Sequence, residues 1–179
     1  MSVHADDGVD LQAYVRDIPD FPRPGVVFRD ITPLLLNPEA LGASISRLSR
    51  YARDLEIDYV VAAEARGFIL GGAIANRLDA GFVPARKRGK LPSDTVSSEY
   101  ALEYGIDALE MHADAFAGGA RVLIHDDLLA TGGTARALAD LVDRLGGEIA
   151  ACVFLVELSS FGGRQKLAPY SVRSLVCLD

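Results

Sequence analysis

Two adjacent acids, Asp126 and Asp127, stand shortly before a loop that contains two glycines and two threonines. This loop, Ala130 to Thr134, follows an apolar run and precedes an amphipathic stretch typical of a helix. Glycine tolerates positive φ and lets a ligand approach the backbone, so the loop can turn its N–H groups toward an anion. Because the partial positive end of the following helix adds to these donors, the pattern predicts a cradle suited to a phosphate.

The acid pair indicates what such a phosphate would be attached to. Carboxylates accept hydrogen bonds from hydroxyls and hold Mg²⁺, whereas they repel a bare phosphate. The stretch from Arg121 to Thr134 therefore fits a ribose phosphate, with the sugar diol against the acids and the phosphate against the loop. The alternative is an ordinary strand–turn–helix in which Asp126 and Asp127 only solvate the turn.

The elements around this stretch alternate between strand and helix patterns. We expect strands at 57–63, 82–85, 121–125 and 149–158. Helices are expected at 67–78 and around Leu138 to Leu145, the latter ended by two glycines. This order predicts an α/β fold with a mainly parallel central sheet flanked by helices, whose ligands bind at the carboxyl ends of the strands.

Two further regions lie outside this alternation. The N-terminal part predicts a helical turn over 11–18, an ordered loop or extended lid at the proline-rich stretch 19–25, and a helix that Asn37 caps ahead of Pro38. Residues 91–108 have the character of a long hairpin.

Composition narrows the class of protein. The chain has 179 residues with 18 basic and 25 acidic side chains, so its net charge of 18 − 25 = −7 argues against a protein that grips duplex nucleic acid. The longest apolar run, 149–156, is far short of a membrane span, and the first residues carry no secretory pattern.

Cys152 and Cys177 are expected to be thiols in a reducing cytoplasm. The histidines lack zinc-ligand spacing. Neither GxGxxG nor GxxxxGKS/T occurs, because Pro84 stands where the latter needs a glycine.

The chain resembles the type I phosphoribosyltransferases, and among them the enzymes that act on adenine. DDLLATGGT marks the wider family, while PDFPRPGVVFRDIT at 19–32 and YALEYG at 100–105 are more specific. Further matching segments are EARGF at 64–68, RKRGKLP at 86–92, LVEL at 155–158 and GGRQKL at 162–167. The resemblance covers roughly residues 18–167.

This resemblance implies a type I phosphoribosyltransferase fold in one domain over 1–179, with a hood at about 18–33 and a flexible catalytic flap at about 88–110. The implied reaction joins adenine to 5-phospho-α-D-ribose 1-diphosphate and gives AMP and diphosphate, a step of purine salvage. It implies Mg²⁺ held mainly by the sugar diphosphate, with no direct protein ligand. A cytoplasmic homodimer without nucleic-acid or membrane partners is expected.

By the same resemblance, Asp126 and Asp127 bind the ribose hydroxyls and favour the cationic sugar of the transition state. The 5′-phosphate would be bound by the loop residues Ala130, Thr131, Gly132, Gly133 and Thr134. A cis peptide is expected between Glu64 and Ala65, presenting N–H groups to diphosphate beside Arg66; Ala65 lacks the hydroxyl usual in the family. The cations that would meet the diphosphate, some across a dimer interface, are Arg86, Lys87 and Lys90. The alternative interpretation of these three basic residues is that they belong to a solvated loop with no ligand.

Base recognition is implied for the hood, where the backbone of Val27 and Arg29 would read the edge of adenine. The Phe28 ring would stack on the base, or be only a core anchor. On the flap, Glu103 is the implied general acid–base at adenine N7, with Tyr104 beside it, or merely an exposed acid. His125, where the family usually has an aliphatic residue, is expected to be a buried histidine that donates to a carbonyl, or a group that shifts the protonation of Asp126.

Two other functions are compatible with this pattern. One is a non-catalytic regulator that uses the phosphoribosyl pocket as a ligand sensor; the chain shows no basic face or additional domain of the kind such regulators carry. The other is an enzyme for another purine, namely xanthine, hypoxanthine or guanine.

Overall fold

The computed structural model of the chain describes residues 8–102 and 105–179. The described residues fall into two compact units, one that ends at Arg47 and one that begins at Leu48. In the described part of the chain, no helix is both long enough and apolar enough to cross a membrane.

The first unit is built around a short antiparallel hairpin. Strand β1 (Arg16–Pro19) pairs with β2 (Val27–Asp30), with Ile18 opposite Phe28. The expectation of a helical turn as far as Ile18 was wrong, because the 3-10 helix η1 (Leu11–Tyr14) ends before the strand begins. Pairing across the hairpin, reinforced by the bond from Arg16 Nη2 to Asp30 Oδ2 at 2.6 Å, outweighs the local helical spacing. The short helix α1 (Thr32–Leu36) follows.

Helix α2 (Pro38–Ala52) begins as the sequence predicts. The Asn37 side chain accepts hydrogen bonds from the backbone N–H of Glu39 at 3.0 Å and of Ala40 at 2.9 Å. Because the first N–H groups of a helix lack partners within it, this cap stabilises the start, where Pro38 loses nothing by lacking an N–H. The turn η2 (Arg53–Leu55) follows the end of α2.

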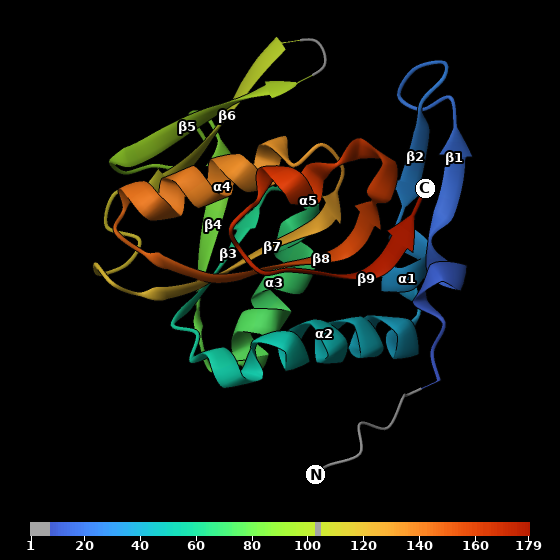
Figure 1. Cartoon of the computed structure of the whole chain (residues 1–179), viewed down its shortest axis with the longest axis horizontal. Helices are drawn as coiled ribbons and strands as arrows, with labels where there is room; N and C mark the ends of the chain where they lie inside the picture. Colours follow the sequence, from blue (N-terminus) through green and yellow to red (C-terminus); the bar gives the residue numbers. More distant parts are fainter. Residues whose placement is uncertain (1–7, 103–104) are drawn as a thin grey trace. The chain divides into compact units, whose positions relative to one another are not determined.

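The second unit contains a seven-stranded sheet in the order β5-β6-β4-β3-β7-β8-β9 (Figure 1). The strands β3, β4, β7, β8 and β9 run parallel, whereas β6 is antiparallel to both β4 and β5. The prediction of a mainly parallel sheet is therefore confirmed. The strands span Tyr59–Ala63 (β3), Gly81–Lys87 (β4), Thr95–Leu102 (β5), Gly105–His112 (β6), Arg121–Leu129 (β7), Glu148–Leu158 (β8) and Val172–Leu178 (β9).

Two helices cover opposite faces of this sheet (Figure 1). Helix α3 (Arg66–Arg77) packs on the face that carries Ala62 and His125, which lie against Gly71. Helix α4 (Gly133–Arg144) packs with Leu138 against the other face, in the main apolar core. The chain passes from β3 to β4 on one side and from β7 to β8 on the other, so the crossovers from these two neighbouring strands run in opposite directions. Such a switch point is where α/β sheets bind ligands.

Two strands differ from the prediction. Strand β7 continues through both acids to Leu129, because its ladder with β8 persists there and pairs Leu129 with Glu157. Strand β9 had not been expected; it adds to the edge of β8 after the turns η3 (Ser159–Phe161) and α5 (Gly163–Lys166). The hairpin expected over 91–108 is present as β5 and β6.

Candidate active site

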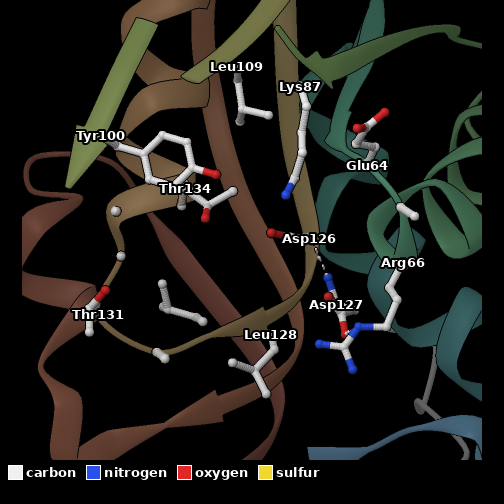
Figure 2. A pocket seen from close by; sticks show the side chains of 16 residues that line it. Glu64, Arg66, Lys87, Tyr100, Leu109, Asp126, Asp127, Leu128, Thr131 and Thr134 are labelled. Carbon is white, nitrogen blue, oxygen red and sulfur yellow. Dashed lines mark hydrogen bonds and ion pairs between the residues drawn. The ribbon is translucent and has the colours of Figure 1, made fainter. Parts of the chain in front are cut away.

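A cavity of about 290 Å³ lies at the carboxyl ends of β3 and β7, at the switch point of the sheet (Figure 2). It brings together the acid pair, the glycine-containing loop and groups from the β3, β4 and hairpin strands. Its lining residues are Glu64, Ala65, Arg66, Lys87, Tyr100, Leu109 and the continuous run 126–135.

The loop 130–134 has the backbone geometry that its glycines predict. Gly132 has φ +76° and ψ 8°, the left-handed region, and α4 begins at the next residue. The carbonyl of Gly132 accepts the N–H of Arg136 at 2.9 Å, which joins the loop to the first turn of the helix. The side chains of Thr131 and Thr134 line the cavity (Figure 2). The arrangement suits an anion, because the N–H groups of the loop and the positive end of α4 meet here.

The two acids lie in a crowded environment at the end of β7. Asp127 is only 5% exposed, and its Oδ2 lies 2.9 Å from Nε of Arg66, the first residue of α3. Its backbone N–H donates to Oδ1 of Asp126 at 2.9 Å. A Cβ placed on Gly67 would lie 2.8 Å from that same Asp126 oxygen, so any larger residue there would have to displace the Asp126 carboxylate.

The protonation of the pair follows from this environment. Burial, and then the neighbouring Asp127 charge, raise the pKa of Asp126 well above its ordinary value. Burial also raises the pKa of Asp127, but the Arg66 guanidinium opposes that rise. We therefore expect the pair to share its charge unequally, with Asp127 the more readily ionised member.

A second group of polar side chains comes from β4 and the hairpin. Lys87 Nζ lies 3.3 Å from Oδ2 of Asp107, and the Tyr100 hydroxyl lies 3.4 Å from the same oxygen. The N–H of Ala108, and next Lys87, lower the pKa of Asp107. Burial, and then Asp107, raise the pKa of Tyr100, whose hydroxyl also interacts with Thr134. These contacts connect the hairpin to the start of α4.

Four other residues expected at the site either do not line the cavity or lie outside the described residues. Arg86 donates from Nε to Glu64 Oε2 at 2.7 Å and from Nη1 to the carbonyl of Lys90 at 3.1 Å. Within the described residues, neither Arg86 nor Lys90 lines the cavity. Glu103 and Tyr104 lie outside the described residues.

The expected base-reading residues belong to the first unit. Val27, Phe28 and Arg29 lie on β2, where Val27 is 47% exposed. The Phe28 ring packs edge-to-face on Phe21, with centroids 5.2 Å apart. Arg29 Nη1 pairs with Asp17 Oδ2 on β1 at 2.5 Å.

His125 is the buried histidine that the sequence predicts. It is fully buried, and its Nδ1 lies 3.0 Å from the carbonyl oxygen of Val153, so this nitrogen carries the proton and donates. Burial lowers the pKa of His125 to about 4. The neutral ring adds no positive charge beside Asp126.

Tyr100, Asp107 and Glu64 were not assigned a side-chain role from the sequence. A usable signal exists for Asp107, because the period-2 alternation of β6 places it on the same face as the buried Leu109 and Met111. An acid on a buried face needs a partner, and Tyr100 is its cross-strand neighbour. Glu64 offers no comparable pattern.

The acidic side chains of the cavity are the candidate ligands for a metal ion. Among the described residues, no group of three or more His, Cys, Asp or Glu side chains could hold a metal ion. Both members of the acid pair nevertheless line the cavity, although Asp127 Oδ2 is already paired with Arg66 Nε at 2.9 Å. Mg²⁺ commonly binds one or two carboxylates together with substrate phosphates and waters, so the acid pair fits a Mg²⁺ that arrives on a phosphorylated substrate.

Comparison with known proteins agrees with this fold. Residues 34–176 match the family of the phosphoribosyl transferase domain. The chain belongs to the phosphoribosyltransferase family.

Within that family, the chain is similar to several adenine phosphoribosyltransferases. The protein of that name from Thermotoga maritima is 56% identical over 168 residues, covering 94% of this chain and 97% of the relative. The crystal structure of adenine phosphoribosyltransferase from Rhodothermus marinus superimposes with a TM-score of 0.90 at 53% identity, covering 94% and 96% of the two chains. The crystal structure of adenine phosphoribosyltransferase from Saccharomyces cerevisiae is complexed with D-2,5-dideoxy-2,5-imino-altritol 1,6-bisphosphate and adenine. It superimposes with a TM-score of 0.85 at 37% sequence identity, covering 90% of this chain and 94% of that chain.

Proposed function

We propose that the protein transfers the 5-phosphoribosyl group from 5-phospho-α-D-ribose 1-diphosphate to adenine, giving AMP and diphosphate. The observation that carries this proposal is that Asp126, Asp127 and the loop 130–134 line the same cavity. Relatives named adenine phosphoribosyltransferase, at 56% identity in Thermotoga maritima, support adenine as the base.

The ribose phosphate end of the substrate would be held by two sets of groups. The N–H groups of loop 130–134 and the hydroxyls of Thr131 and Thr134 would bind the 5′-phosphate. Asp126 and Asp127 would accept hydrogen bonds from the ribose hydroxyls. As the bond from C1 to the diphosphate breaks, the sugar becomes cationic, and the fixed charge on the acid pair stabilises it without reorganisation.

The diphosphate end would lie toward Arg66 and Lys87, which both line the cavity. The peptide between Glu64 and Ala65 is cis, as the resemblance implies, and precedes Arg66 directly. We propose that N–H groups there complete the diphosphate site. Lys87 would leave its ion pair with Asp107 and bind the diphosphate instead. Arg86 and Lys90 would add positive charge nearby. Mg²⁺ carried by the diphosphate would neutralise further charge, with the acid pair as its nearest carboxylates.

Adenine would be read by the backbone of Val27 and Arg29 and stacked on Phe28, in the hood at about 18–33. Hydrogen bonds must discriminate between bases, because stacking accepts any of them. N9 would form the new bond to C1 as the bond from C1 to the diphosphate breaks. Glu103, on the flap at about 88–110, would act as the general acid–base at N7 and take up the N7 proton, which leaves the base of AMP neutral. Closing the flap would exclude the water that could hydrolyse the sugar.

We further propose a homodimer that works in the cytoplasm. The dimer is what the resemblance to the type I phosphoribosyltransferases implies. A sugar diphosphate carries several negative charges and crosses membranes poorly, so the enzyme must meet it where it is made. Sedimentation equilibrium checks the dimer: a mass of one chain at micromolar concentration would contradict it.

The reaction is tested by mixing the protein with Mg²⁺, the sugar diphosphate and one base at a time. Adenine should give AMP and diphosphate, while hypoxanthine, guanine and xanthine should react orders of magnitude more slowly. Turnover of another base in preference to adenine would refute the assignment of the base. Binding of the sugar diphosphate without turnover of any base would indicate a ligand sensor instead.

A further inference from the structure

The backbone of Gly163 lies directly against the loop that faces the cavity. A Cβ on Gly163 would stand 2.2 Å from the carbonyl oxygen of Ala130 and 2.9 Å from the backbone nitrogen of Gly132. In the other direction, a Cβ on Gly132 would stand 2.7 Å from the carbonyl oxygen of Gly163. The two backbones therefore meet with no room for a side chain, so the position of Gly163 fixes that of the loop.

Arg164, the next residue, holds this part of the chain in place. Its Nε donates to Glu157 Oε1 at 3.0 Å, its Nη2 to Glu157 Oε2 at 2.5 Å, and its Nη1 to the carbonyl of Val172 at 2.7 Å. Ser174 Oγ also donates to Glu157 Oε2 at 2.5 Å. The guanidinium is thus bound to β8 and to β9 at once.

Glu157 suits this task by its burial and its charge. The residue is 7% exposed, and the hydrogen bonds of Arg164 lower its pKa, so it is ionised at neutral pH. A planar guanidinium binds a carboxylate through two parallel bonds, which fix orientation as well as distance. Glu157 is also paired with Leu129, the last residue of β7 before the loop.

We infer that Glu157, Arg164 and Ser174 form a lock that positions the phosphate-binding loop by seating Gly163 beneath it. The inference rests on the proposed function, because it assigns the 5′-phosphate to loop 130–134. Among the described residues that line the cavity, none belongs to the lock, so these are positioning residues that act through the backbone of the loop.

The inference predicts a selective loss of phosphate affinity. Gly163→Ala forces Ala130 and Gly132 apart from Gly163 and moves the N–H groups of the loop. The dissociation constant for ribose 5-phosphate, measured by calorimetry, should rise at least about tenfold, the effect of losing one or two hydrogen bonds. The KM for the sugar diphosphate should rise in parallel, while the KM for adenine stays unchanged.

Gly72→Ala is the matched control. Gly72 lies within α3, has no neighbour within 4 Å of an added Cβ, and does not line the cavity. It should bind ribose 5-phosphate as the unsubstituted protein does. Gly163→Ala with unchanged affinity, or with equal losses for adenine and the sugar diphosphate, would overturn the inference.

Variants of the lock decide the matter if Gly163→Ala does not fold. Glu157→Gln keeps the shape but weakens the charge-assisted bonds, and should weaken ribose 5-phosphate binding about threefold to tenfold. Arg164→Lys keeps the charge but lacks the fork, so it should not restore the affinity that Arg164→Gln loses. Full restoration by lysine, or normal affinity in Glu157→Gln, would show that the lock does not position the loop. If the unsubstituted protein itself fails to bind ribose 5-phosphate, the proposed function fails instead.

Discussion

Arg66 Nε lies 2.9 Å from Asp127 Oδ2, so the first residue of α3 is paired with an acid near the end of β7. Arg66 is more than one-third exposed, whereas Asp127 is almost fully enclosed. The pair therefore joins the group proposed to meet the diphosphate to the group proposed to face the ribose. The guanidinium also opposes the burial that raises the pKa of Asp127, and so keeps its charge available.

Asp127→Asn removes this charge while preserving the shape of the side chain. We expect kcat/KM for AMP formation to fall about 10²- to 10³-fold, the usual effect of losing one preorganised electrostatic contact to a transition state. The melting temperature should change little. Steady-state kinetics and thermal denaturation measure the two effects. Asp54→Asn, an exposed acid in η2, is the control and should behave normally. Near-normal turnover in Asp127→Asn would contradict the role of the acid pair.

Tyr100→Phe removes the hydroxyl that lies 3.4 Å from Asp107 and interacts with Thr134. Because this hydroxyl connects the hairpin to the start of α4, its loss should raise the KM for the sugar diphosphate about threefold to tenfold. Tyr51→Phe, on the exposed side of α2, is the same chemical change away from the cavity. Equal KM values for the two variants would show that Tyr100 is only a packing residue.

Glu103→Gln tests the proton transfer proposed for the flap. The amide cannot exchange a proton with adenine N7, so kcat should fall by about 10²-fold or more while binding of the sugar diphosphate stays unchanged. Rapid-mix kinetics with a direct binding measurement separates the two quantities. Glu99→Gln, on β5 of the same hairpin, removes an acid paired with exposed Arg88 and should keep normal kcat. A loss confined to binding would assign Glu103 a different task.

The lowered pKa of His125 predicts that the stability of the folded protein depends on pH. Its pKa is about 4 in the folded protein against 6.5 for an unperturbed histidine, so the unfolded chain binds more protons between these values. The stability contributed by the neutral ring is therefore complete above about pH 6.5 and is lost progressively toward pH 4, by up to about 3 kcal/mol.

Urea unfolding of the unsubstituted protein and of His125→Val, from pH 4 to pH 7, measures this term. Asp126, with its raised pKa, acts in the opposite sense, but it is common to both proteins and cancels in the difference. The unfolding free energy of the unsubstituted protein minus that of His125→Val should become smaller as the pH falls from 7 to 4, because only the unsubstituted protein loses the contribution of the neutral ring. A constant difference would show that His125 is not held neutral by burial.

The sequence was sufficient for features that depend on local patterns. The alternation of apolar runs and helices predicted the parallel sheet, and the glycines of loop 130–134 predicted the turn with positive φ at Gly132. The cap at Asn37 depends on residues next to it, so it too could be predicted. Each of these features is decided within a few residues of chain.

Features decided by distant partners could not be predicted in this way. Strand β7 extends to Leu129 because β8 pairs with it, and Ile18 lies in a strand because Phe28 is opposite. The close approach of Gly163 to Ala130 and Gly132 joins two segments far apart in the sequence, so nothing near either segment indicates it. Lys87 and Arg86 are neighbours, yet the alternation of β4 turns them toward Asp107 and Glu64.

The central claim is that one cavity holds a ribose between the acid pair and the loop. A crystal structure of the protein with AMP tests it most directly. The phosphate should lie within hydrogen-bonding distance of the backbone nitrogens of Gly132 and Gly133, with the ribose hydroxyls on Asp126 and Asp127. A phosphate bound elsewhere, or a ribose turned away from both acids, would contradict the account.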